Sequence, residues 1–185
     1  ADTTAAPEKS EAETEAEAKD DAASGDLIVV GYAQVGAESD WRTANTESFK
    51  STFTEENGYK LIFDDAQQKQ ENQIKAIRSF IQQDVDYIVV APVVETGWEA
   101  VLQEAQEAGI PVILSDRQMD VDESLYECWV GGNFIKEGET AGNWLADYLK
   151  AQGRDGEDIN IVTLQGTIGA SAQVGRTEGF GNILK

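Results

Sequence analysis

Short apolar runs alternate with amphipathic stretches along the chain after residue 26. An apolar run of strand length without a polar interruption, such as Ile110–Leu114, is typical of a strand that is buried on both faces of a parallel sheet. The pattern predicts strands at Leu27–Tyr32, Tyr59–Phe63, Asp86–Ala91, Pro111–Ser115, Leu125–Val130 and Ile159–Leu164.

Between most of these runs, apolar residues recur at the three- and four-residue spacing of an amphipathic helix. Residues 73–81 place three isoleucines on one face, and residues 97–109 align Trp98, which we expect in the core, with the apolar positions that follow it. Gly58 and Gly109 are suitable helix ends, because glycine is favoured just after the last helical residue. Each of them stands directly before a predicted strand. This alternation predicts an α/β fold with a doubly wound parallel sheet.

A further helix is expected over Ile135–Ala151. Gly138 and Gly142 lie one turn apart in it, and since glycine inside a helix costs about 1 kcal/mol relative to alanine, close packing against a neighbour is the expected reason. The rest of its buried surface is expected from Trp144, Leu145, Tyr148 and Leu149. No strand follows the last expected helix, Gly169–Lys185, so we expect that the sequence is cut within a domain.

Residues 1–26 differ in composition from the rest of the chain. They carry nine acidic and two basic residues and no aromatic or large aliphatic one, so they bury too little apolar surface to offset their chain entropy. We expect a disordered acidic tether, and an Ala/Glu-rich helix around Ser10–Lys19 is the alternative.

Charge and cysteine usage exclude several functions. The 185 residues include 35 acidic and 14 basic ones, a net charge of −21, which disfavours nucleic acid and anionic lipid as partners. Histidine is absent and Cys128 is the only cysteine, so disulfides, thiolate or imidazole metal sites and Ser-His or Cys-His catalysis are ruled out. We expect a buried, inert thiol at Cys128, no metal, no cofactor and no enzymatic activity.

Membrane and export signals are weak in this sequence. No apolar run approaches the roughly 20 residues of a membrane span, and no secretory signal peptide is recognisable. If the protein is exported, we expect that this is the processed form.

Polar and aromatic side chains follow several predicted strands, at the edge of the sheet where open α/β proteins bind ligands. Three of the five arginines of the chain fall there. The candidate ligand-binding residues are Ser39, Trp41, Arg42, Asp116, Arg117, Asn133 and Arg176.

The chemistry of this set favours a neutral polyol over a phosphate. Guanidinium groups donate to neighbouring hydroxyls, an aspartate accepts hydroxyl protons, and an indole packs against the C–H face of a sugar ring. Structural alternatives remain open: an ion pair between Asp116 and Arg117, core packing of Trp41 at a helix start, a solvated Arg176, and a helix cap at Asn133.

Motifs of other functions are incomplete. Gly31 and Gly36 do not form a dinucleotide-binding fingerprint, and residues 166–171 lack the lysine of a phosphate loop. Residues 169–173 do not form a nucleophile elbow, and no histidine is present to serve one.

Five longer motifs carry a family resemblance. They are V-G-Y-A-Q-V-G-A-E-S-D-W-R (Val30–Arg42), Q-Q-K-Q-E-N-Q-I-K-A-I-R-S-F (Gln67–Phe80), A-P-V-V-E-T-G-W (Ala91–Trp98), I-P-V-I-L-S-D-R (Ile110–Arg117) and L-Q-G-T-I-G-A-S (Leu164–Ser171). They resemble the sugar-binding proteins of bacterial ABC importers of the ribose-binding type, the type I periplasmic binding proteins, and most of all the galactofuranose-binding members. The resemblance covers the chain after residue 26.

The resemblance implies two α/β lobes that are joined by a hinge and close on one monosaccharide. It implies a first lobe at residues 27–130 and a partial, truncated second lobe at 131–185, with the first crossing near Gly131–Asn133. The residues that map to the family's ligand-contacting positions are Ser39, Trp41, Arg42, Asp116, Arg117 and Arg176. It also implies a monomeric extracytoplasmic receptor that delivers the sugar to an ABC permease, and the acidic tether fits a lipid-anchored receptor on a Gram-positive surface.

Two other functions are compatible with this fold. The effector domain of a lactose-repressor-like regulator would follow a basic helix-turn-helix, but an acidic segment stands in that place. A chemosensory receptor would hand the sugar to a membrane sensor instead of a permease.

Overall fold

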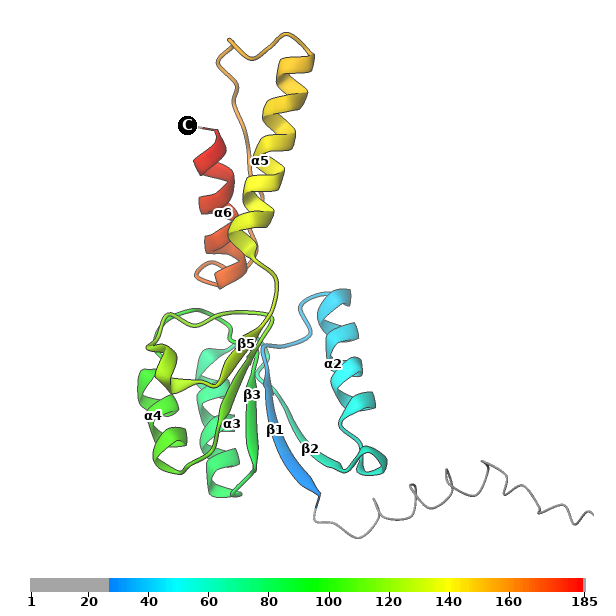
Figure 1. Ribbon diagram of the computed structural model, residues 1–185, viewed down its shortest axis with the longest axis vertical. Coiled ribbons are helices and arrows are strands. Elements are labelled where there is room, and N and C mark those ends of the chain that lie inside the picture. The colour runs from blue at the N-terminus through cyan, green and yellow to red at the C-terminus, as the bar shows by residue number, and fades with distance from the viewer. Residues whose placement is uncertain (1–26, 185) are drawn as a thin grey trace, which may run out of the picture.

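The computed structural model describes residues 27–184, so the expected tether at residues 1–26 lies outside the described part. Five strands form one sheet in the order β2-β1-β3-β4-β5, and all neighbours are parallel (Figure 1). Their bounds are β1 Ile28–Gln34, β2 Tyr59–Asp65, β3 Tyr87–Val90, β4 Val112–Ser115 and β5 Cys128–Val130. The predicted parallel sheet of an α/β fold is therefore confirmed.

Three helices flank this sheet: α2 (Asp40–Thr52), α3 (Gln70–Gln82) and α4 (Glu99–Glu107). Helix α2 lies on one face, and α3 and α4 lie on the other (Figure 1). Strand β3 serves both faces, because successive side chains of a strand point to opposite sides. Ile88 and Val90 pack in the cluster with Trp98, whereas Val89 packs in the cluster with Tyr32. Trp98 is fully buried, as predicted.

Two more helices, α5 (Phe134–Ala151) and α6 (Ser171–Ile183), stand beyond the carboxyl edge of the sheet (Figure 1). Their backbones cross in direct contact. A Cβ atom added at Gly138 would collide with the carbonyl oxygen of Arg176, and one added at Gly179 would collide with the carbonyl oxygen of Ile135. The close packing predicted for Gly138 and Gly142 is confirmed, and the neighbour is α6.

The predicted strand Ile159–Leu164 is wrong. This segment connects α5 to α6 without regular structure, and Val162 and Leu164 are 89% and 95% exposed. A strand needs a neighbour that accepts and donates its backbone hydrogen bonds, and no strand of residues 27–184 lies beside this segment.

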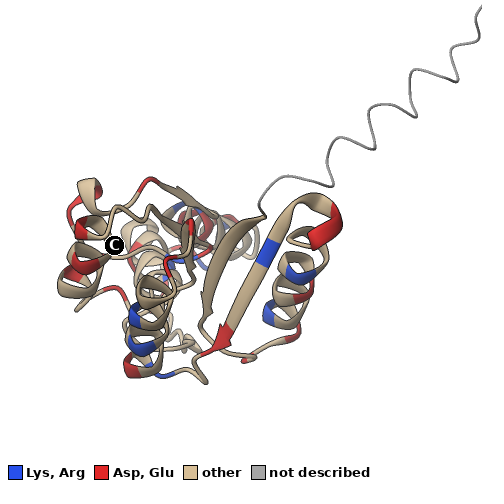
Figure 2. Cartoon of the chain, turned by 90° about the horizontal axis from the view of Figure 1, so that it is seen from below, with Lys and Arg blue, Asp and Glu red and all other residues tan. Residues whose placement is uncertain are grey.

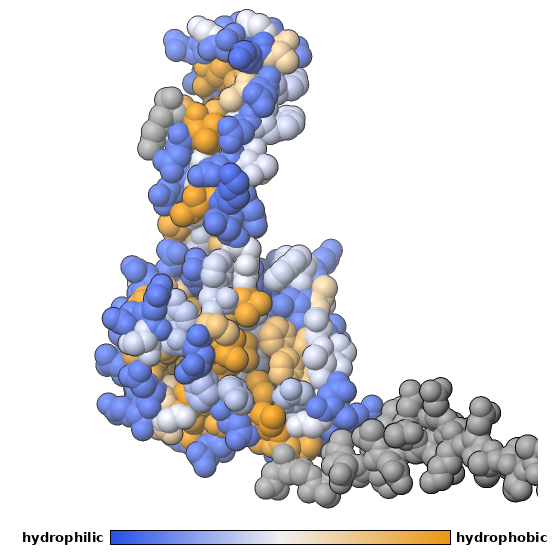
Figure 3. Space-filling view, in the orientation of Figure 1, coloured by the Kyte–Doolittle hydropathy of each residue, from blue (hydrophilic) through white to orange (hydrophobic). Residues whose placement is uncertain are grey.

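The burial predicted for one face of α5 is wrong for Trp144 and Tyr148. These rings stack on each other with centroids 5.4 Å apart and are 65% and 50% exposed. Only the glycine face of α5 meets α6, and apolar surface is visible over this pair of helices (Figure 3).

Cys128 is exposed and not buried as predicted. It lies in β5, a strand of three residues at the edge of the sheet, and it belongs to neither of the two hydrophobic clusters. The strand begins later than predicted because residues 123–125 form a 3-10 turn.

Charged side chains of both signs are spread along the helices (Figure 2). Within residues 27–184, no helix combines the length and the apolar character that crossing a membrane requires.

Candidate functional site

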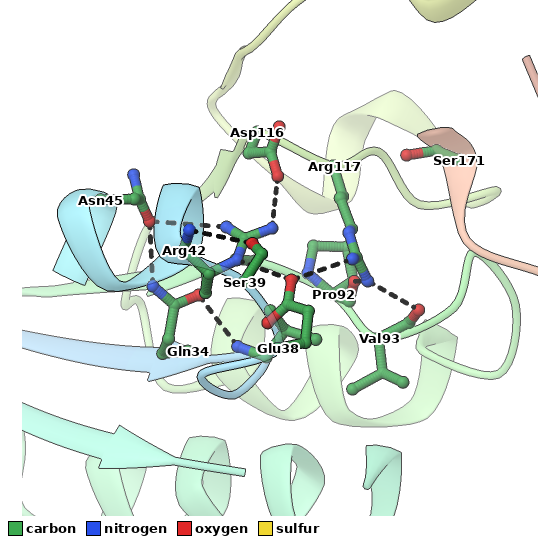
Figure 4. Close-up of polar contacts among 12 residues, drawn as sticks. Gln34, Glu38, Ser39, Arg42, Asn45, Pro92, Val93, Asp116, Arg117 and Ser171 are labelled. Carbon is green, nitrogen blue, oxygen red and sulfur yellow. Dashed lines mark hydrogen bonds and ion pairs between the residues drawn. The ribbon is translucent and has the colours of Figure 1, made fainter. Parts of the chain in front are cut away.

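The predicted edge of the sheet carries a network of buried arginines and half-buried carboxylates (Figure 4). It is built by the loop between β1 and α2, by the residues that follow β3, and by the residues that follow β4. Because the carboxyl ends of parallel strands meet at one edge, segments far apart in the sequence contact each other here.

Arg42 is the centre of this network. Ser39 caps α2 by accepting a hydrogen bond from the Arg42 amide over 3.1 Å, which fixes the first turn of the helix. The guanidinium, only 2% exposed, donates from Nη2 to Asp116 Oδ2 over 2.5 Å and from Nε to Glu38 Oε1 over 3.0 Å. Burial opposes its charge, but the hydrogen bonds and negative charges of Asp116 and Glu38 outweigh burial and raise the pKa of Arg42.

Asp116 and Arg117 do not pair with each other, so the predicted alternative of an ion pair between them is wrong. Asp116 has a positive φ of 63°, and the Arg117 amide donates to the Ser115 carbonyl over 2.7 Å. This three-residue turn is rare for a residue with a side chain. It sends the carboxylate of Asp116 to Arg42 and the guanidinium of Arg117 toward the loop after β3.

Arg117 is held by three oxygens. Its Nη1 donates to the carbonyls of Val93 and Pro92 over 3.2 and 3.4 Å, and its Nη2 donates to Glu38 Oε1 over 3.2 Å. Burial, followed by the like charge of Arg42, lowers the pKa of Arg117. The shared carboxylate of Glu38 thus connects the two arginines.

A second layer of buried polar groups supports Arg42 from below. Asn45 Oδ1 accepts hydrogen bonds from the Tyr32 hydroxyl and from Gln34 Nε2, each over 2.9 Å, and from Arg42 Nη1 over 3.4 Å. Burial raises the pKa of Tyr32 to about 12, so its hydroxyl stays a donor at neutral pH.

Trp41 and Arg176 also face this region, and each takes part in a cation–π contact. Trp41 lies in the first turn of α2, at the helix start that the alternative for this residue stated, but it is 58% exposed and does not fill the core. The Arg42 Cζ atom lies 4.9 Å from its ring centroid. Arg176 in α6 donates from Nε to Glu137 of α5 over 2.8 Å, and its Cζ atom lies 4.9 Å from the Phe134 ring centroid.

Asn133 is a helix cap, one of the two roles that the sequence left open. Its side chain accepts a hydrogen bond from the Lys136 amide over 2.9 Å at the start of α5. It does not line the cavity described next.

A cavity of about 390 Å³ lies between the carboxyl edge of the sheet and the base of α5 and α6. Six of the seven predicted site residues line it; Asn133 is the exception. Its lining is Glu38, Ser39, Trp41, Arg42, Asp116, Arg117, Gly132, Phe134, Glu137, Ala172 and Arg176. The lining carries three carboxylates and three guanidinium groups, so its formal charges cancel.

A larger cavity of about 690 Å³ adjoins this one and shares Arg117 and Arg176. One side of it is the irregular segment 163–167, in which Leu164 is 95% exposed. Three charged side chains line the larger cavity and six line the smaller one, so the smaller cavity is the better candidate for specific binding.

Sequence reasoning missed Glu38 and Asn45. A signal for Glu38 was present, because buried arginines need carboxylate partners and Glu38 stands four residues before Arg42. Asn45 had no such signal, since its role depends on the position of Tyr32 and Gln34 on a neighbouring element. No group of three or more Asp, Glu or Cys side chains within residues 27–184 is arranged to hold a metal ion.

Comparisons with known proteins identify a family and a fold for the chain. A sequence profile described as "Periplasmic binding protein domain" matches residues 30–185. Over 159 residues the chain is 50% identical to the galactofuranose-binding protein YtfQ of Escherichia coli K12, an alignment that covers 85% of this chain and 48% of the relative.

Solved structures with the same fold include sugar complexes. A protein from Mycobacterium smegmatis in complex with β-D-fucofuranose has a TM-score of 0.79 and 53% identity, over 85% of this chain and 51% of that protein. The binding protein of the arabinose ABC transporter from Shewanella sp. ANA-3, bound to α- and β-L-arabinofuranose, has a TM-score of 0.75 and 50% identity, over 84% and 50%. The chain spans about half the length of the curated relatives it matches.

Proposed function

This chain belongs to the periplasmic binding protein family, and from that premise we propose that it serves as an extracytoplasmic solute receptor of an ABC transporter. In this proposal it binds a monosaccharide between two lobes and delivers it to a permease. The relatives named above are binding proteins and not enzymes.

One observation carries the proposal: the cavity combines cancelled charges with an exposed indole. All three guanidinium groups already face a carboxylate, so an anionic ligand would meet no uncompensated positive charge. The same groups still offer many donors and acceptors to hydroxyls. Trp41, 58% exposed on the lining, provides a flat apolar surface for the C–H face of a ring. A neutral polyol fits this combination.

The relatives support a proposal for the ring form of the ligand. Their names and complexes include galactofuranose, fucofuranose and arabinofuranose. We therefore propose a five-membered ring for the ligand of this chain.

The predicted arrangement of lobes is part of the proposal. Residues 27–130 would form the first lobe and residues 131–185 the beginning of the second, with the crossing at Gly131–Asn133. In support, β5 ends at Val130 and α5 begins at Phe134. The proposed ligand contacts are Ser39, Trp41, Arg42, Asp116, Arg117 and Arg176.

Titration calorimetry on the full-length protein tests this function. Galactofuranose or arabinofuranose should bind, and galacturonate, which carries a negative charge, should not. Exchange of Arg117 for the apolar Met should weaken sugar binding about 100-fold or more, because a buried hydrogen-bonded charge is removed from the cavity. Arg78→Met, which removes an exposed guanidinium outside the cavity, is the matched control. If no neutral sugar binds to the unchanged protein, the proposed function is wrong.

A further inference from the structure

Gln73 is a fully buried polar residue on the face of α3 that packs against the sheet. The other buried residues of this helix are Ala76, Ile77 and Phe80, which contribute only apolar surface. A buried amide without partners would be unfavourable, and Gln73 has three. It donates to the carbonyls of Ala33 and Ala91 over 3.1 and 2.7 Å, and it accepts from the Val93 amide over 2.9 Å.

These three bonds organise the segment 91–93, which follows β3. Strand β3 ends at Val90, so the Ala91 carbonyl and the Val93 amide are beyond the strand ladder. Both groups are satisfied by the single side chain of Gln73. The side-chain amide of Gln73 on α3 therefore fixes the backbone conformation of segment 91–93.

The same segment holds Arg117. The Val93 residue whose amide donates to Gln73 also accepts, through its carbonyl, the bond from Arg117 Nη1 over 3.2 Å, and the Pro92 carbonyl accepts from the same nitrogen over 3.4 Å (Figure 4). One residue thus connects the Gln73 amide to the guanidinium in the cavity. Gln73 itself does not line the cavity.

We propose that Gln73 is a positioning residue for ligand binding, which fixes the carbonyls of Pro92 and Val93 so that they hold the Arg117 guanidinium in place. This inference rests on the proposed function. A preorganised donor binds more tightly than a mobile one, because less freedom is lost when the ligand arrives. Without Gln73, the Val93 amide loses its acceptor and the segment is free to turn its carbonyls away from Arg117.

The test compares Gln73→Met with the unchanged full-length protein. Methionine keeps the length of the side chain and removes all three hydrogen bonds. The substitution should accelerate hydrogen exchange at the Val93 amide at least about 10-fold relative to amides within β3. The sugar Kd should rise about 10-fold or more. Ile77→Val is the matched control, because Ile77 is equally buried one turn along α3 and has no polar contact with the segment. It should lower the thermal stability and leave the Kd unchanged.

Gln73→Leu is the second variant, which keeps the experiment informative if Gln73→Met does not fold. Leucine also removes all three hydrogen bonds and leaves no polar group in the buried site, so its Kd should rise as in Gln73→Met. An unchanged Kd in the folded Gln73 variants, with sugar binding intact in the unchanged protein, would overturn this inference alone. Absence of sugar binding by the unchanged protein would overturn the proposed function, and the inference with it, whatever the exchange rate at Val93.

Discussion

Arg42 and Asp116 are 74 residues apart in the sequence, and the guanidinium of one donates to the carboxylate of the other over 2.5 Å. This bond ties the first turn of α2 to the residue that follows β4. Because Arg42 is 2% exposed, its charge depends on these carboxylate partners for compensation.

Asp116→Asn should therefore destabilise the protein. The neutral amide accepts a weaker hydrogen bond from a buried guanidinium, and we expect the free energy of unfolding to fall by about 1–3 kcal/mol in urea denaturation. Asparagine tolerates the positive φ of this position, so the exchange tests the charge and not the backbone.

The control for this prediction is Glu104→Gln. It breaks another arginine–carboxylate pair, between Arg78 on α3 and Glu104 on α4, in which both side chains are exposed. Exposed pairs contribute little, so the midpoint of unfolding should hardly change. Equal losses in the two variants would contradict a special role of the buried pair.

Trp41→Ala should weaken sugar binding and leave stability nearly intact. Its indole is 58% exposed on the cavity lining, so removal costs little packing but deletes the surface for the sugar ring. We expect a rise in Kd of about 10-fold or more, measured by calorimetry. Trp144→Ala, at 65% exposure and outside the cavity lining, should leave the Kd unchanged. Similar affinities for the Trp41 variant and the unchanged protein would show that no ring stacks there.

Gly179→Ala should separate α5 from α6. The added methyl group would collide with the carbonyl of Ile135, and overpacking of this kind costs about 1–3 kcal/mol. Faster hydrogen exchange in both helices is the measurement. Gly181→Ala on the same helix meets nothing within 4 Å and should stabilise α6 by up to about 1 kcal/mol. The prediction fails if the two variants behave alike.

The pair of Glu95 and Asp120 gives a pH dependence. Burial, and then the charge of Asp120, raise the pKa of Glu95, so the folded state disfavours its ionised form. This contribution to stability is therefore fully present below the unfolded-state pKa of about 4.3 and is lost as the pH rises from there through the higher folded-state pKa. Asp120→Asn should raise the melting temperature at pH 7, and the gain should disappear by about pH 3.

Asp122→Ala is the control of opposite sign. Hydrogen bonds from the side chain and backbone of Ser124 lower the pKa of Asp122, so its contribution to stability is present at neutral pH and is lost as the pH falls. The variant should be less stable than the unchanged protein at pH 7, with a difference that shrinks in acid. Parallel pH profiles for the two variants would contradict these assignments.

The sequence was sufficient where local pattern decides the outcome. The apolar run before Asp116 predicts β4, and the glycine spacing in α5 predicts a close neighbour. Both predictions depend only on the types and spacing of residues that are close in the sequence. The apolar run Ile159–Leu164 has the same local pattern as a strand, but a strand also needs a partner, and periodicity carries no information about partners.

The sequence predicted most of the residues that line the candidate cavity, but it did not predict which of them pair with each other. Residue types and strand ends brought six of the predicted residues to one cavity. The choice of partners depends on backbone detail: the turn at Asp116 directs two adjacent charges to different segments, and Glu38 Oε1 accepts from two arginines that lie 75 residues apart. The turn has no signature in composition or spacing, and the four-residue spacing between Glu38 and Arg42 does not indicate that Glu38 also accepts from Arg117.

The ion pairs of the cavity divide between its two walls. On the sheet side, Arg42 pairs with Glu38 and Asp116, and Arg117 pairs with Glu38. Arg176 pairs with Glu137 within the two helices. Each wall is electroneutral by itself. A change in the distance between the two walls therefore separates no net charge, and long-range Coulomb forces favour no particular distance. If the two lobes close on a ligand as proposed, the energy of closure has to come from short-range contacts with that ligand.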